Sequence, residues 1–136
     1  MSSMFKNAGY NAGTFGLDLS NWNTSNVTNM GTMFQSFKAS QMDIDLSSFN
    51  TSNVTDMTWM FRGTSLQSLN IASFDNSKVT SATEMFGYSH NLNYLDISGF
   101  SKTTSDMFAY NYYLSKIKVG SKFSGSFLPY PDSFYI

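Results

Sequence analysis

Short hydrophobic motifs recur along the chain at nearly constant intervals, separated by runs of Ser, Thr and Asn. The dipeptide Met-Phe occurs at residues 4–5, 33–34, 60–61, 85–86 and 107–108. A second motif, two apolar residues flanking one polar residue, occurs at 17–19, 44–46, 69–71, 95–97 and 117–119. Both motifs advance in step with a period of about 25 residues, which predicts a solenoid in which each repeat forms one coil of a stack.

The later repeats contain the pattern of a leucine-rich repeat. The segments "LQSLNIASF" (66–74), "LNYLDISGF" (92–100) and "LSKIKVGSK" (114–122) carry apolar residues at their first, fourth and sixth positions. This pattern predicts one short parallel strand in each coil. An aromatic residue stands where leucine-rich repeats carry Asn, and these aromatic residues are predicted to form a buried structural spine: Trp22, Phe49, Phe74 and Phe100.

The Ser- and Thr-rich segments are predicted to begin short helices. Val27, Met30, Met33 and Phe34 have the spacing of one helical face, and residues 54–61 repeat it. Thr24, Ser25 and Ser52 precede these runs, where N-cap residues occur. The predicted fold class is therefore an α/β solenoid of right-handed leucine-rich-repeat-like coils, with short parallel strands on one side and short α or 3₁₀ helices on the other. Residues 1–136 are expected to form a single domain of about five coils, the first one partial, with a closing segment at 117–136.

Composition narrows the classes of function. Only 12% of the residues are charged and the net charge is −1, so the chain offers no electrostatic basis for binding nucleic acid. The absence of cysteine excludes disulfides and thiolate metal sites, and the single histidine, His90, indicates no histidine metal site; no cofactor is predicted. No apolar run approaches the length of a membrane span. The sequence contains no nucleophile elbow or phosphate loop, and the predicted function is not enzymatic.

The repeats "DLSNWNTSNVTNMGTMF" and "DLSSFNTSNVTDMTWMF" resemble those of the BspA-like leucine-rich-repeat proteins of bacterial cell surfaces. The resemblance covers roughly residues 1–125, and "IKVGSKFSGSFLPYPD" is similar to the family's closing segment. It implies an extracellular or cell-surface location and adhesion to host proteins or surfaces. The family's signal peptide and anchor are not found in this sequence. Because "MSSMF" matches "MGTMF", the chain is interpreted as starting inside a coil, as a fragment or truncated member.

One polar position recurs in the middle of the predicted strands, facing away from the core. It is occupied by Asp18, Asp45, Asn70, Asp96 and Lys118. Neighbouring parallel strands lie about 4.8 Å apart, so this column either holds a cation or a basic ligand or is a solvated strand face. The spacing of an EF-hand calcium loop is absent.

Outward-facing aromatic residues are the other candidates for binding. Tyr94 lies on the same strand face as Asp96, and Trp59 is predicted to point out of its helix. Further aromatic residues follow the Met-Phe pairs, where they either anchor a partner or pack between coils: Tyr10, Phe37, Tyr88, Tyr110, Tyr112 and Tyr113. The predicted binding set is Asp18, Asp45, Asn70, Tyr94, Asp96 and Trp59.

Two functions are consistent with these features. The first is an adhesion module that displays the strand face and aromatic loops to a protein or glycan of a host or neighbouring cell. The second is a structural module whose open coil ends stack into fibres or larger arrays. Neither function involves membrane insertion or nucleic acid.

Overall fold

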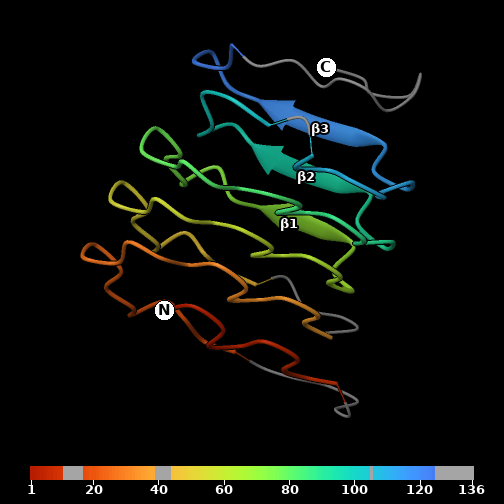
Figure 1. Cartoon of the computed structure of the whole chain (residues 1–136), viewed down its shortest axis with the longest axis horizontal. Coiled ribbons are helices and arrows are strands. Elements are labelled where there is room, and N and C mark those ends of the chain that lie inside the picture. Colours follow the sequence, from red (N-terminus) through yellow and green to blue (C-terminus); the bar gives the residue numbers. More distant parts are fainter. Residues whose placement is uncertain (11–16, 39–43, 105, 125–136) are drawn as a thin grey trace.

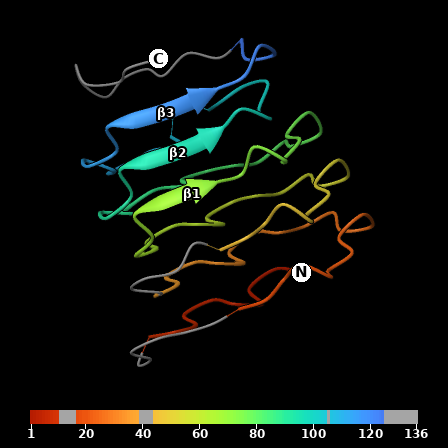
Figure 2. The same ribbon diagram turned by 180° about the vertical axis from the view of Figure 1, so that it is seen from behind.

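The computed structural model describes residues 1–10, 17–38, 44–104 and 106–124, and the chain in it winds through coils that stack in sequence order (Figures 1 and 2). Three short strands lie in its later coils: β1 (Ser68–Asn70), β2 (Tyr94–Ile97) and β3 (Lys116–Val119). They form one parallel sheet in the order β1-β2-β3. The sheet places Leu69, Leu95 and Ile117 in register, and all three are buried.

The predicted helices are absent from the described residues, so the prediction of an α/β solenoid is wrong. The segments around the Met-Phe pairs form consecutive turns instead, and we call them together the turn ladder: residues 1–8, 30–37, 57–64, 82–89, 104 and 106–111. In one such segment the N–H groups of Met33, Gln35 and Phe37 each donate to the carbonyl three residues earlier, at 3.1–3.2 Å. The intervening N–H groups, those of Thr32, Phe34 and Ser36, donate to carbonyls of the next coil at 2.8 Å.

The backbone angles of the turn ladder are incompatible with a helix. Thr32 and Ser36 have positive φ values of 57° and 54°, and Trp59 and Tyr88 occupy the same region at 56° and 57°. A right-handed helix requires negative φ at every residue. A segment of about eight residues is also too short to be a stable helix by itself. The hydrogen bonds from alternate N–H groups to the neighbouring coil satisfy the backbone donors and acceptors, and they also join the coils.

The apolar core runs between the strand side and the turn ladder. Phenylalanines of the Met-Phe pairs stack along it with centroid distances of 5.4–5.9 Å: Phe5, Phe34, Phe61, Phe86 and Phe108. We call this row the phenylalanine ladder. In the predicted spine, Phe49, Phe74 and Phe100 are buried and Trp22 is half-buried. Phe49 stacks on Phe74 at 6.2 Å, whereas Trp22 contacts Phe5 instead.

Buried polar side chains join the coils where helix caps were predicted. The Thr24 hydroxyl donates to the carbonyl of Asn50 at 3.0 Å and accepts its N–H at 2.8 Å. The Thr51 hydroxyl makes the same two bonds to Asp75, at 2.9 and 2.8 Å. The assignment of these residues as helix caps is therefore wrong, because the threonines bond to the neighbouring coil and not to a following helix. Ser25 and Ser52 instead donate their N–H groups to the side chains of Asn23 and Asn50.

The regular pairing weakens toward the N-terminal end of the stack. Residues 17–19 and 44–46 form no strand, although Leu19, Ile44 and Leu46 are buried. Isolated parallel bridges join Asn29 to Asp56 and Asp56 to Ser81 where the turn ladder begins. Residues 125–136 of the predicted closing segment lie outside the described residues.

Candidate functional site

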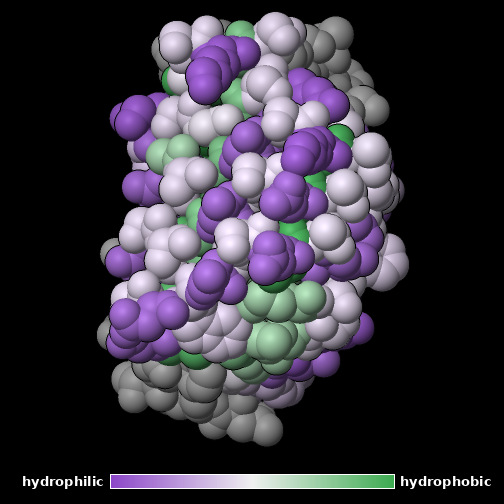
Figure 3. All heavy atoms as spheres, turned by 90° about the vertical axis from the view of Figure 1, so that its left-hand side faces the viewer, coloured by the Kyte–Doolittle hydropathy of each residue, from purple (hydrophilic) through white to green (hydrophobic). Residues whose placement is uncertain are grey.

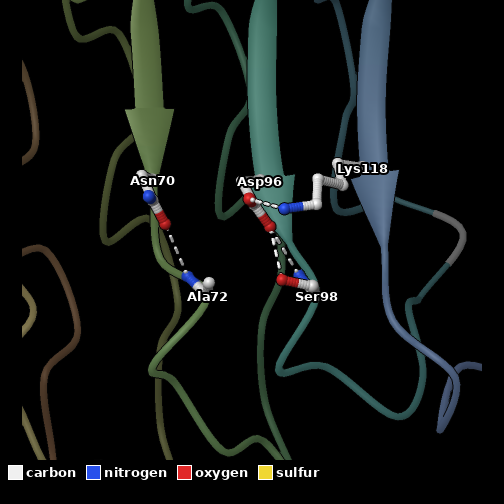
Figure 4. Close-up of polar contacts among 5 residues, drawn as sticks. All are labelled: Asn70, Ala72, Asp96, Ser98 and Lys118. Atoms are coloured by element: carbon white, nitrogen blue, oxygen red, sulfur yellow. Dashed lines mark hydrogen bonds and ion pairs between the residues drawn. The ribbon is translucent and has the colours of Figure 1, made fainter.

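The Asp and Asn side chains of the polar column predicted from the sequence fold back on the backbone that follows them, whereas Lys118 reaches across to Asp96 (Figure 4). Asn70 Oδ1 accepts the Ala72 N–H at 3.0 Å, and Asp96 Oδ1 accepts the Ser98 N–H at 3.0 Å. Asp18 and Asp45 accept the N–H groups of Ser20 and Ser47 in the same way, each at 2.9 Å. An aspartate or asparagine that bonds the N–H two residues ahead forms an Asx turn. The four Asp and Asn members of the column therefore stabilise the turns that follow them.

Hydrogen bonds keep the exposed carboxylates of this column ionised. The hydroxyl and then the N–H of Ser20 lower the pKa of Asp18, and Ser47 lowers the pKa of Asp45 through the same two groups. The charge of Asp18 acts in the opposite direction on Asp45, but it is the smaller effect. A carboxylate with a lowered pKa is a weak general base and is not protonated at neutral pH. These two side chains carry fixed negative charge on the strand side.

Asp96 has a different environment from the other members of the column. It is only 4% exposed, and Lys118 donates to its Oδ2 at 3.0 Å. Burial acts to raise the pKa of Asp96, but hydrogen bonds from Ser98 and Lys118, together with the lysine charge, lower it overall. The same pairing raises the pKa of Lys118. Asp96 is thus a buried carboxylate in an ion pair with an exposed lysine.

A shallow groove brings together three of the six predicted binding residues. Asp45, Asn70 and Tyr94 come from three successive coils and line one groove of about 540 Å³. Its floor includes Ile44, Leu46 and Leu69, and serines line much of the remainder: Ser47, Ser68 and Ser73. Lys116 lies over the ring of Tyr94 at 5.7 Å and restrains it. We call this site the strand-face groove.

Trp59 lies away from the strand-face groove, on the turn ladder. It is 38% exposed, and the guanidinium of Arg62 lies 5.2 Å from its ring centre. Arg62 also donates to Glu84 at 2.7 Å and covers Tyr88 at 4.3 Å, and Tyr88 stacks on Tyr110 at 4.6 Å. We call this group of Trp59, Arg62, Glu84, Tyr88 and Tyr110 the aromatic cluster. Sequence reasoning predicted that Trp59 points outward and left Tyr88 and Tyr110 either exposed or packed between coils. It missed Arg62, which contacts the rings of Trp59 and Tyr88.

The spacing of the repeats contained a signal for the aromatic cluster. Asn7, Ser36, Gly63, Tyr88 and Tyr110 all stand two residues after a Met-Phe pair, and all have positive φ. Asn and Gly accept this conformation readily, whereas a bulky residue in it is uncommon. The change from small to aromatic residues at this position marks where the cluster begins.

The remaining aromatic candidates divide between the core and the surface. Phe37 is fully buried, and Tyr10, Tyr112 and Tyr113 are exposed. His90 is also exposed and lies parallel to Tyr112 at 6.4 Å. Figure 3 shows the face toward which the strand arrows of Figure 1 point, where hydrophilic residues prevail and small hydrophobic areas are visible between them.

The described residues form neither a metal-binding cluster nor a membrane-spanning helix. These residues contain no group of three or more His, Asp or Glu side chains arranged to hold a metal ion. None of the described segments is a helix with the length and apolarity needed to span a bilayer.

The sequence profile of one protein family matches most of the chain. The family described as "Mycoplasma protein of unknown function, DUF285" matches residues 1–119, and the chain belongs to this family. That description assigns the family no activity, ligand or partner. No curated protein and no solved structure gives a significant match.

Proposed function

We propose that the chain is a non-enzymatic binding module that acts at an extracellular or cell surface. In this proposal the strand side contacts a protein or glycan on a host or neighbouring cell. The observation that carries the proposal is the strand-face groove, in which Asp45, Asn70 and Tyr94 from three coils line one surface. Carboxylate, amide and tyrosine groups around an apolar floor are typical of sites that orient a polar ligand.

The chemistry of the carboxylates favours binding over catalysis. General acid–base catalysis needs a carboxyl group whose pKa is close to the working pH, and the pKa values of Asp18 and Asp45 are lowered instead. Asp96 is paired with Lys118. The proposed role of the polar column is therefore to build the strand ends and to set the charge of the groove.

The experiment is a binding assay on an array of glycans and on purified extracellular-matrix proteins. Tyr94→Ala should weaken binding about thirtyfold, because truncating an aromatic anchor costs about 2 kcal/mol or more. Tyr112→Ala is the matched control, since Tyr112 is 69% exposed and does not line the groove. Unchanged binding by a folded Tyr94→Ala variant would overturn the assignment of the strand-face groove. If Trp59→Ala weakens binding and Tyr94→Ala does not, the binding face lies on the turn ladder.

A second candidate function, end-to-end stacking of coils, is favoured by a separate observation. Met4 is 50% exposed, whereas Met33, its equivalent in the next coil, is fully buried. Phe5, Trp22 and Val27 are likewise only partly buried, while their equivalents in the next coil lie in the core. The first layer of the described stack therefore presents an apolar face, and such faces promote association.

Light scattering of the wild type and of Phe5→Lys tests the stacking function. Stacking predicts a wild-type particle larger than one chain, which the charge at position 5 dissociates. A wild-type monomer whose size Phe5→Lys does not change excludes stacking through this face. Loss of glycan or matrix binding in Tyr94→Ala without any change in particle size would support the first function over the second.

A further inference from the structure

One column of the turn ladder changes from large to small residues along the stack. Met30, Met57, Ala82 and Thr104 occupy equivalent positions, since each carbonyl accepts the N–H of the methionine in the following Met-Phe pair at 3.1–3.2 Å. Met30 and Met57 are fully buried and fill the core, and Ala82 is also buried, at 4% exposure. An alanine leaves most of the space of a methionine side chain unfilled.

A pocket of about 310 Å³ lies at this place, and we call it the Ala82 pocket. Val79, Ala82 and Met107 form its apolar wall, and Lys102 lines it from the next coil. The connection between the aromatic residue and the next methionine is also shorter here. It runs from Phe100 to Met107 in this coil, whereas in the preceding coil it runs from Phe74 to Met85. Two independent changes in the sequence, the small residue and the shortened connection, thus coincide with one pocket.

The polar groups around the Ala82 pocket are already bonded within the protein. The Asn76 amide donates to the Lys102 carbonyl at 2.8 Å, and its oxygen accepts the Ser101 N–H at 2.9 Å. The Thr80 hydroxyl donates to the Thr55 carbonyl, and the Thr104 hydroxyl donates to Asp106. Lys102 is the one charged residue among the lining residues that the structure describes, and it forms no ion pair with the described part of the chain.

We propose that the Ala82 pocket binds a short aliphatic chain that carries a carboxylate. The chain would lie against Val79, Ala82 and Met107, and the carboxylate would lie toward Lys102, whose charge it complements. The volume is at the lower limit of about 300–1,000 Å³ for small-molecule pockets, which selects a small ligand. This site is separate from the strand-face groove, so it goes beyond the proposed binding function and does not depend on it.

The test is an NMR titration of the full chain with butyrate, hexanoate and octanoate, using hexan-1-ol as the neutral probe. Each added methylene that enters the pocket should tighten binding about fourfold, until the pocket is full. Hexanoate should bind more tightly than hexan-1-ol, and Lys102→Gln should remove a preference of about two- to fivefold. Signals of Val79, Ala82 and Met107 should shift, while those of Tyr94 should not.

Ala82→Met fills the pocket with the side chain that the preceding coils have at the equivalent positions, Met30 and Met57. It should fold and lose hexanoate binding, whereas Tyr94→Ala should retain binding. Hexanoate binding that survives Ala82→Met would overturn the site, and so would the absence of any titration at millimolar hexanoate. Equal binding of hexan-1-ol and hexanoate would overturn the assignment of a carboxylate ligand.

Discussion

The strand side and the turn ladder join the same coils with different backbones. On the strand side, β1, β2 and β3 pair through extended chain, and successive side chains point to opposite faces of the sheet. On the turn ladder, alternate N–H groups bond to the next coil, and the intervening ones close turns within the coil. Positive φ recurs on the turn ladder, including at Thr32, Trp59 and Glu84, and at no described strand residue.

This difference decides which side tolerates changes of amino acid at its surface positions. An extended strand accepts most residues at its outward positions, so Asn70 and Tyr94 can occupy neighbouring places on β1 and β2 without backbone strain. The turn ladder fixes φ at set positions, where a bulky residue carries a conformational cost. Tyr88 and Tyr110 accept that cost in the coils where Arg62 and ring stacking hold them. Adaptable surface chemistry is therefore expected on the strand side, and a rigid aromatic surface on the turn ladder.

Truncating one phenylalanine on each side is the strongest test of the comparison. Phe61 stacks between Phe34 and Phe86, at 5.4 and 5.9 Å, whereas Phe74 stacks on Phe49 at 6.2 Å. Each replacement by Ala should reduce the free energy of unfolding by about 3–5 kcal/mol, with Phe61→Ala the larger loss. Urea denaturation gives both values. A loss below about 1 kcal/mol for either variant would contradict the burial of that ring.

Gly99→Ala probes how closely successive coils approach on the strand side. A Cβ atom at Gly99 would lie 2.2 Å from the Phe74 carbonyl oxygen, which is too close for any real contact. We expect a loss of about 1–3 kcal/mol, the usual cost of overpacking. Gly31→Ala is the control on the turn ladder, since its nearest neighbour would be the Asn29 side chain at 3.2 Å. Equal unfolding free energies for the two variants would show that the coils are not packed as described.

Thr51→Val removes the hydroxyl that joins two coils but keeps the shape of the side chain. Thr51 is 1% exposed and makes two hydrogen bonds to the backbone of Asp75. Leaving these groups without a partner should cost about 1–3 kcal/mol, while Thr51→Ser should cost less. Ser52→Ala should change the unfolding free energy by less than about 0.5 kcal/mol, as a surface substitution does. Thermal unfolding of the three variants distinguishes this arrangement from a helix cap, in which Ser52 would also matter.

The ion pair between Asp96 and Lys118 predicts a small loss of stability in acid. The pKa of Asp96 is lowered in the folded protein, so its contribution is fully present above the usual aspartate pKa of about 3.9. That contribution is lost as the pH falls below this value and through the folded pKa. Asp96→Asn should flatten the change in unfolding free energy across this range. Unfolding free energies of wild type and Asp96→Asn that fall in parallel below pH 4 would contradict the lowered pKa of Asp96.

Periodicity predicted the length of the repeat but not the conformation of the backbone. Met30, Met33, Phe34 and Phe37 are all buried, and their spacing of i, i+3, i+4 and i+7 is the one that a helix produces. Consecutive turns bury the same positions, so the hydrophobic pattern cannot distinguish the two. Positive φ at Thr32 or Trp59 could not be inferred, because neither residue type favours it. The phenylalanine ladder was present in the spacing of the Met-Phe pairs, but the motif was assigned to helices.

The candidate site was predicted residue by residue but not as a shape. The polar column was found because its members recur in the middle of the apolar-x-apolar motif. Their bonds to Ser20, Ser47 and Ser98 could not be foreseen, because they depend on how the chain turns after each strand segment. The strand-face groove and the Ala82 pocket arise between coils. Neither is visible in one repeat read alone.

Measuring which carbonyl accepts the Phe61 N–H tests the turn ladder most directly. NMR scalar couplings across hydrogen bonds identify the acceptor of a given amide. The turn ladder predicts a coupling from the Phe61 nitrogen to the carbonyl carbon of Met85, one coil away, where the N···O distance is 2.9 Å. A coupling to Met57, four residues earlier in the sequence, would show that the segment is a helix and would contradict the account.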